Sequence, residues 1–263
     1  MHDKPLLPAL AFALGTAALN VTSTAMAADD THCFNGYGYT LDSNEYRYTE
    51  HHEQHFAGDT LRSWDVTYVG RTGDTIATKH LAFKASDTVP TYRLEIPADG
   101  YVEGIRHSGD RWTMFRRESA DAKEQTEDFT IEPPMAADSG FDRLVRQQFD
   151  ELTAGETVPF KFAAAGRQAV IDLRARQTGT TTFEGKPAVV FTAELDMFLV
   201  NFFVDSLKLT YDADSKRLLE YRGIGNMHDE NGKVYPVRVS YTRDMPAEAR
   251  QAGAPAATCG AAS

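Results

Sequence analysis

Three histidines and two glutamates gather within six residues, in the run Glu50-His51-His52-Glu53-Gln54-His55. If this run is a strand, His51, Glu53 and His55 share one face, because strand side chains alternate between faces. Two imidazoles and a carboxylate are suitable ligands for a first-row metal ion. Residues at i and i+4 of a strand are about 13 Å apart, however. A single metal ion could therefore be held by only two of these three candidate ligands, together with a residue from a distant part of the chain.

The phase of the same run places its other two ionisable residues differently. Tyr46, Tyr48 and Phe56 occupy even positions and predict the core face of the strand. Glu50 and His52 then point inward beside the tyrosines, and the odd-numbered residues point to solvent. A polar pair beneath a sheet is either a satisfied internal hydrogen bond or a polar contact in a ligand pocket. Glu50 and His52 are therefore candidate ligand-binding residues.

A second unusual stretch covers residues 197–204, of which only Asn201 is polar. Such a run is typical of a fully buried strand or short helix. The alternative is an apolar lining for a lipid-like ligand, in which Phe198 and Phe202 supply apolar surface and Asn201 and Asp205 supply polar contacts. The sequence leaves both interpretations open.

Motifs for cofactor and nucleotide chemistry are missing from the sequence. It contains no G-x-S-x-G elbow, no P-loop and no complete G-x-G-x-x-G, so no catalytic residue and no cofactor is predicted. The net charge of −11 argues against nucleic acid as a partner, because no basic patch could neutralise phosphates.

The elements that position these residues are predicted to be mainly strands. Short alternating segments, such as the one carrying Trp64, Val66 and Tyr68, lie between turn signals such as those at 72–74 and 97–100. Between residues 132 and 156 the pattern changes to one amphipathic helix with an apolar stripe. The stripe consists of Phe141, Leu144, Val145, Phe149 and Leu152.

A helix of this kind must bury its stripe against another element. We therefore expect a strongly curved antiparallel sheet or incomplete barrel, with the helix packed in its concave face. Two smaller domains divided near Pro133-Pro134 are the alternative.

The first 27 residues have the features of a secretory signal peptide. Lys4 precedes an apolar stretch at 6–21, and Ala25-Met26-Ala27 is a small-residue cleavage site. The apolar stretch is too short for a membrane span, and Cys33 lacks the preceding residues of a lipoprotein. We expect a signal peptide at 1–27, one β-rich domain at 28–245 and a flexible Ala/Gly/Pro-rich tail at 246–263. The product would be periplasmic or secreted, not membrane-spanning, and of undetermined oligomeric state.

The chain has two cysteines, Cys33 and Cys259. In an oxidising compartment they most simply form a disulfide that ties the two ends of the domain together. Two unpaired thiols are the alternative.

Several short motifs resemble a family of secreted proteobacterial proteins related to a broader periplasmic domain of unknown function. They are YTEH at 48–51, IATK at 76–79, GYVEG at 100–104, AGE at 154–156 and LLEYRGIGN at 218–226. The resemblance implies a periplasmic β-rich protein similar to the lipoprotein-carrier fold, in which a curved sheet wraps a helix and holds an acyl chain. It assigns no catalytic residue.

The leading hypothesis is a non-enzymatic periplasmic binding or carrier protein for an apolar or lipid-like ligand. One alternative is an envelope hydrolase that uses a metal at His51, Glu53 and His55 or the internal Glu50–His52 pair. The other is an envelope assembly factor whose sheet edge or apolar patch binds another protein.

Overall fold

The structure, a computed structural model, describes residue 1, residues 29–196 and residues 206–259. In these ranges fifteen strands form one sheet. The strands are β1 (Asp29–Thr40), β2 (Tyr46–Ala57), β3 (Thr60–Gly70), β4 (Thr75–Ala82), β5 (Thr91–Ile96), β6 (Tyr101–Ser108), β7 (Arg111–Arg117), β8 (Gln125–Phe129), β9 (Met135–Ala136), β10 (Thr157–Ala164), β11 (Ala169–Phe183), β12 (Lys186–Leu195), β13 (Leu207–Asp212), β14 (Leu218–His228) and β15 (Val234–Ser240).

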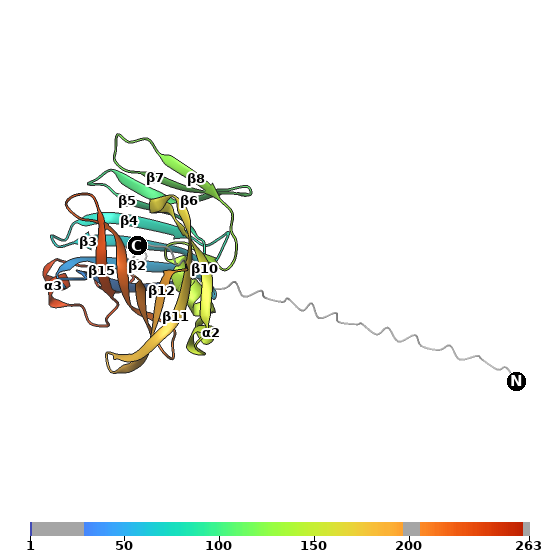
Figure 1. The fold of residues 1–263 in the computed structure, drawn as a ribbon. Helices are drawn as coiled ribbons and strands as arrows, with labels where there is room; N and C mark the ends of the chain where they lie inside the picture. The colour runs from blue at the N-terminus through green and yellow to red at the C-terminus, as the bar shows by residue number, and fades with distance from the viewer. Residues whose placement is uncertain (2–28, 197–205, 260–263) are drawn as a thin grey trace.

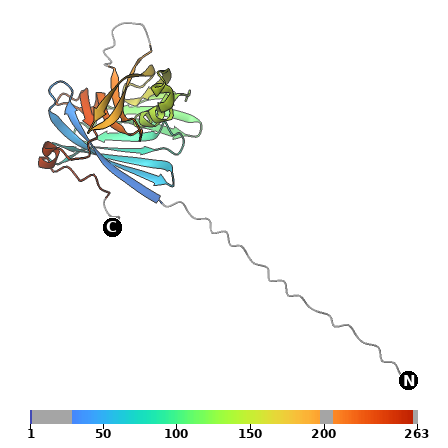
Figure 2. The same ribbon diagram turned by 90° about the horizontal axis from the view of Figure 1, so that it is seen from below.

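The sheet is open, and its order is β8-β7-β6-β5-β4-β3-β2-β1-β15-β14-β13-β12-β11-β10-β9. Neighbouring strands are antiparallel, except that β9 and β10 run parallel. The sheet curves, so that the strands coloured blue to green and those coloured yellow to red form two facing walls (Figures 1 and 2). The predicted curved sheet is confirmed. It continues through both segments that flank Pro133-Pro134.

Alternation of side chains explains why one face of the sheet forms the core. In β3 Trp64, Val66 and Tyr68 are all buried on the concave side. In β12 Val189, Phe191 and Ala193 are buried in the same way. Both walls therefore present apolar or aromatic side chains to a common interior, as expected for strands with one buried face.

The predicted helix is present as two short helices on the concave face, α1 (Gly140–Gln147) and α2 (Phe149–Thr153). The helical path is interrupted at Gln148, where φ is −100° and ψ is 14°. The five residues of the predicted apolar stripe are nevertheless all buried. They pack against inward-facing side chains of β10 to β13, for example Phe149 against Phe191. The chain leaves α2 through Gly155 at φ +91°.

One expectation about phase was wrong at Tyr46. It packs with Tyr37 and Tyr39 in a separate cluster, which includes Ala249 of α3 (Ala247–Gln251). The cause is a β-bulge between β1 and β2, where Gly38 pairs with Tyr48 but Tyr39 pairs with Tyr46. The extra residue in β2 turns Tyr46 to the opposite face from Tyr48. The helix α3 lies within the segment predicted as a flexible tail.

The predicted disulfide between Cys33 and Cys259 is confirmed, with a Cα–Cα distance of 5.2 Å. It fastens the segment that follows α3 to β1, and the Asn35 side chain adds a 2.8 Å hydrogen bond to the Pro255 carbonyl. A structural disulfide indicates an oxidising, extracytoplasmic environment. Among the described residues, no helix combines the length and apolar character needed to cross a bilayer.

Candidate functional site

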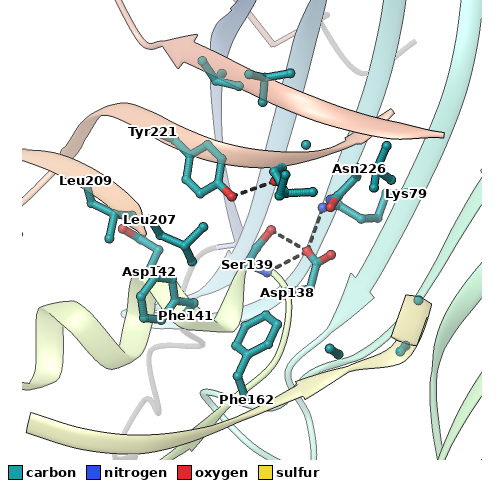
Figure 3. Close-up of a pocket in the computed structure, with 18 of the residues that line it drawn as sticks. Lys79, Asp138, Ser139, Phe141, Asp142, Phe162, Leu207, Leu209, Tyr221 and Asn226 are labelled. Carbon is teal, nitrogen blue, oxygen red and sulfur yellow. Dashed lines mark hydrogen bonds and ion pairs between the residues drawn. The ribbon is translucent and has the colours of Figure 1, made fainter. Parts of the chain in front are cut away.

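A cavity of about 360 Å³ lies between the curved sheet and the short helices. This volume falls within the range of about 300–1,000 Å³ that is common for small-molecule sites. From β2 to β6 the lining receives the ionisable residues Glu50, His52, Lys79 and Glu103, whereas β10 to β15 contribute mostly apolar side chains. Figure 3 shows the junction of the two regions, where Lys79 and Asp138 lie near Phe141, Phe162 and Leu207. The cavity is therefore polar on one wall and apolar on the other.

Glu50 and His52 project from β2 into this cavity, and both are buried. The indole N–H of Trp64 donates to His52 Nδ1 at 3.0 Å, which fixes the hydrogen of the imidazole on Nε2. His52 Nε2 then donates to Glu50 Oε2 at 3.0 Å. Tyr241 donates to the same carboxylate oxygen at 3.3 Å. Both ring nitrogens of His52 are engaged, so its imidazole offers no lone pair to act as a base.

The electrostatics of this network favour a neutral histidine. Burial lowers the pKa of His52, and Glu50 only partly opposes this effect. Burial also raises the pKa of Tyr241 well above its ordinary value, so its phenol keeps its hydrogen and donates. The Glu50 carboxylate thus receives two hydrogen bonds from neutral groups.

Lys79 of β4 and Asp138 form a buried ion pair at 2.7 Å. Each side chain is only 5% exposed. Burial alone would lower the pKa of Lys79, but Asp138 and Tyr68 outweigh burial and raise it above its ordinary value. Asp138 also accepts from the backbone N–H and the hydroxyl of Ser139, as Figure 3 shows. The pair fixes the start of α1 to the middle of the polar wall.

Glu103 of β6 is a half-buried carboxyl group on the polar wall. Tyr101 donates to Glu103 Oε2 at 2.6 Å and Tyr92 donates to Oε1 at 3.3 Å. Burial raises the pKa of Glu103 despite these hydrogen bonds. Glu103, Lys79 and His52 lie in one row across the sheet. In this row His52 pairs with Val66, Val66 with Lys79, Lys79 with Leu94, and Leu94 with Glu103.

The opposite wall is formed largely by aliphatic and aromatic side chains. Leu173 of β11, Ala193 of β12, Leu207 and Leu209 of β13 and Val237 of β15 line the cavity there. Asp142 of α1 is an ionisable group on this side, and Tyr211 donates to it at 3.1 Å while Arg146 pairs with it at 2.9 Å. Burial raises the pKa of Asp142 even though Arg146 opposes that shift.

The other predicted ligand-binding residues, Phe198, Asn201, Phe202 and Asp205, lie outside the described residues. The strands on either side of them both reach the cavity, through Leu195 and Leu207. The predicted role of the 197–204 run stays a prediction.

The three candidate metal ligands of β2 each lie beside different neighbouring residues. The His51 ring bonds to the Asn35 side chain at 2.9 Å, and His55 Nε2 lies 3.1 Å from Asp65. Glu53 pairs in register with Cys33 and Asp65. Within the part of the chain that the structure describes, no group of three or more His, Cys, Asp or Glu side chains is arranged to hold a metal ion.

Several cavity residues were missed in the sequence, although a signal for two of them existed. Lys79 lies between Ala77 and Leu81 in the inward phase of β4, and Glu103 lies between Tyr101 and Ile105 in the inward phase of β6. A charged residue in an inward phase indicates a paired or functional group. Asp138 carried no such signal, because it belongs to an irregular segment before α1.

Comparison with known proteins adds no relative: no protein-family model, curated protein or solved structure matches this chain.

Proposed function

We propose that this protein is a non-enzymatic binding or carrier protein of the cell envelope, and that its ligand is an apolar or lipid-like small molecule. The observation that carries the proposal is the cavity, with its apolar wall facing a wall of hydrogen-bonding groups. Ligand sites are mostly apolar with a few polar groups that orient the bound molecule. An amphipathic molecule would bury its chain against β11 to β13 and its polar end against β2 to β6.

The side chains of this site favour ligand binding over catalysis. His52, the one histidine among the described residues of the cavity lining, has both nitrogens engaged, and Lys79 is held as an ammonium by Asp138. Neither of these two side chains therefore offers the free lone pair that a base or nucleophile requires. The disulfide and the predicted signal peptide favour a place in the periplasm or outside the cell.

The test is native mass spectrometry of the chain expressed with its leader and purified without detergent. We expect a co-purified amphipathic molecule that is released on denaturation. Ala193→Phe would project a ring into the cavity, since Ala193 lies on its lining, and should reduce the bound fraction severalfold. Val170→Phe is the matched control, because Val170 is exposed on the outer face of β11. Equal ligand content in the two variants, or repeated ligand-free spectra, would overturn the proposal.

A further inference from the structure

We propose that the polar end of the cavity is a site for a cationic head group, an alkylammonium or related amine, which Glu50 receives through Oε1. The inference rests on the proposed function and specifies the chemical class of its ligand. It depends on the hydrogen bonds of Glu50, on the charges around it and on the aromatic rings that enclose it.

Among the described residues, hydrogen-bond donors engage only one oxygen of Glu50. His52 and Tyr241 both donate to Oε2, and no described residue donates to Oε1. Oε2 also lies on the side of β1, 3.1 Å from the position that a Cβ on Gly36 would occupy. Glu103 differs, because each of its oxygens already accepts from a tyrosine. Glu50 Oε1 is therefore an unused acceptor among the described residues and is not sealed from solvent, so a ligand that enters the cavity can reach it.

The charge of the polar wall is unbalanced. The carboxyl groups of Glu50, Glu103 and Asp138 share this lining with the ammonium of Lys79, which pairs with Asp138, and with Arg167, while burial raises the pKa of Glu103. Within the described ranges, neither Glu50 nor Glu103 forms an ion pair with a lysine or arginine. A buried carboxylate without a cationic partner is costly, and a bound cation would offset that cost. A second anion would be repelled.

Tyrosine rings share the cavity lining with Glu50. Tyr48, Tyr68, Tyr221 and Tyr241 all line the cavity. Burial raises the pKa of Tyr48, Tyr221 and Tyr241, and the nearby Glu50 carboxylate raises it further. These rings are therefore neutral phenols close to Glu50. Neutral aromatic faces beside a carboxylate form the kind of cage that binds quaternary ammonium groups.

The wild-type chain tests the inference with three ligands that share a decyl chain: decyltrimethylammonium, decan-1-ol and decane-1-sulfonate. Isothermal titration calorimetry, below the micelle concentration of the two ionic ligands and below the solubility limit of the alcohol, gives the three dissociation constants. We expect the ammonium ligand to bind at least about tenfold more tightly than the sulfonate, with the alcohol between them. Equal binding of all three, or tighter binding of the sulfonate, overturns the head-group inference and leaves the proposed function standing. No binding of any of them overturns both.

Three variants locate the head group. Glu50→Gln keeps the shape and the acceptors for His52 and Tyr241, and should remove most of the preference for the cation. Glu103→Gln removes an equal charge from the same wall and should cause a smaller loss. Glu127→Gln removes an equal charge from the exposed strand β8 and should leave the preference unchanged. If Glu103→Gln has an effect as large as Glu50→Gln, the assignment to Glu50 is wrong. Should a variant fail to fold, the comparison of ligands on the wild-type chain decides.

Discussion

The Lys79–Asp138 ion pair is nearly closed to solvent, so its two charges depend on each other. Lys79→Met removes the ammonium and leaves the Asp138 carboxylate buried without a counter-charge. We expect the free energy of unfolding to fall by about 3–5 kcal/mol, as for other broken buried pairs. Urea denaturation followed by circular dichroism measures the change.

The double variant Lys79→Met/Asp138→Asn is the control for this prediction. Asparagine tolerates the left-handed backbone of Asp138, where φ is +43°, and carries no charge. The double variant should therefore be more stable than Lys79→Met alone. Additive losses from the two single changes would show that the charges are not coupled.

The free energy of unfolding should depend on pH through His52. Its folded-state pKa lies below the unfolded value of 6.5, because burial, with help from the Lys79 charge, outweighs Glu50. Below pH 6.5 the unfolded chain takes up a proton at this residue before the folded protein does. The His52 contribution to stability is thus fully present above pH 6.5, and it is lost as the pH falls through the lowered folded-state pKa.

The measurement compares unfolding free energies of the wild-type chain and of His52→Gln between pH 8 and pH 5. The wild-type advantage should shrink towards the acidic end. Glu103 and Asp142 act in the opposite direction, since their raised pKa values favour protonation of the folded state, but both chains share them. Curves that stay parallel over this range would contradict the prediction.

At the scale of the element, β1 shows why a strand needs glycine. A Cβ on Gly38 would stand 2.6 Å from two atoms of the Tyr48 ring. Gly38→Ala should therefore push the ring aside and lower the free energy of unfolding by about 1–3 kcal/mol. Gly179→Ala in β11 meets nothing within 4 Å and should be neutral or raise stability by about 0.4–1 kcal/mol. Similar effects of the two changes on thermal unfolding would refute the steric explanation.

Alternation in the sequence predicted most strands after Tyr46 and the inward position of Glu50 and His52, and together with the apolar helix stripe it predicted the curved sheet, but it did not predict β1. It failed at Tyr46, because a bulge changes the phase and a two-residue period has no signal for an inserted residue. It could not find Asp138, whose place in the cavity depends on the turn before α1. The partners of Glu50 were equally hidden, since Tyr241 is 191 positions away in the chain.

At the scale of the whole molecule, the disulfide closes a loop with a sequence separation of 226 residues. In the chain-entropy model, opening so long a loop destabilises the folded state by up to about 5 kcal/mol. The double variant Cys33→Ser/Cys259→Ser should lose stability towards that ceiling in urea denaturation. Reduced wild-type protein should unfold at the same urea concentration as the variant. A variant as stable as the oxidised wild type would contradict this role.

The order of the strands has a consequence for how the protein is made. Along the sheet from β9 to β15 and then from β1 to β8, each strand pairs with its neighbour in sequence. Among the described strands, β1–β15 is the one pairing between strands far apart in the chain. Each wall can therefore assemble from local contacts, with low contact order, as it emerges during synthesis or export. The sheet joins the two walls only when β15, the last described strand, pairs with β1, although β6 and β7 already contact residues 165–167. A binding cavity between them is thus completed at the end of chain delivery, and the Cys33–Cys259 bond can form only from that point on.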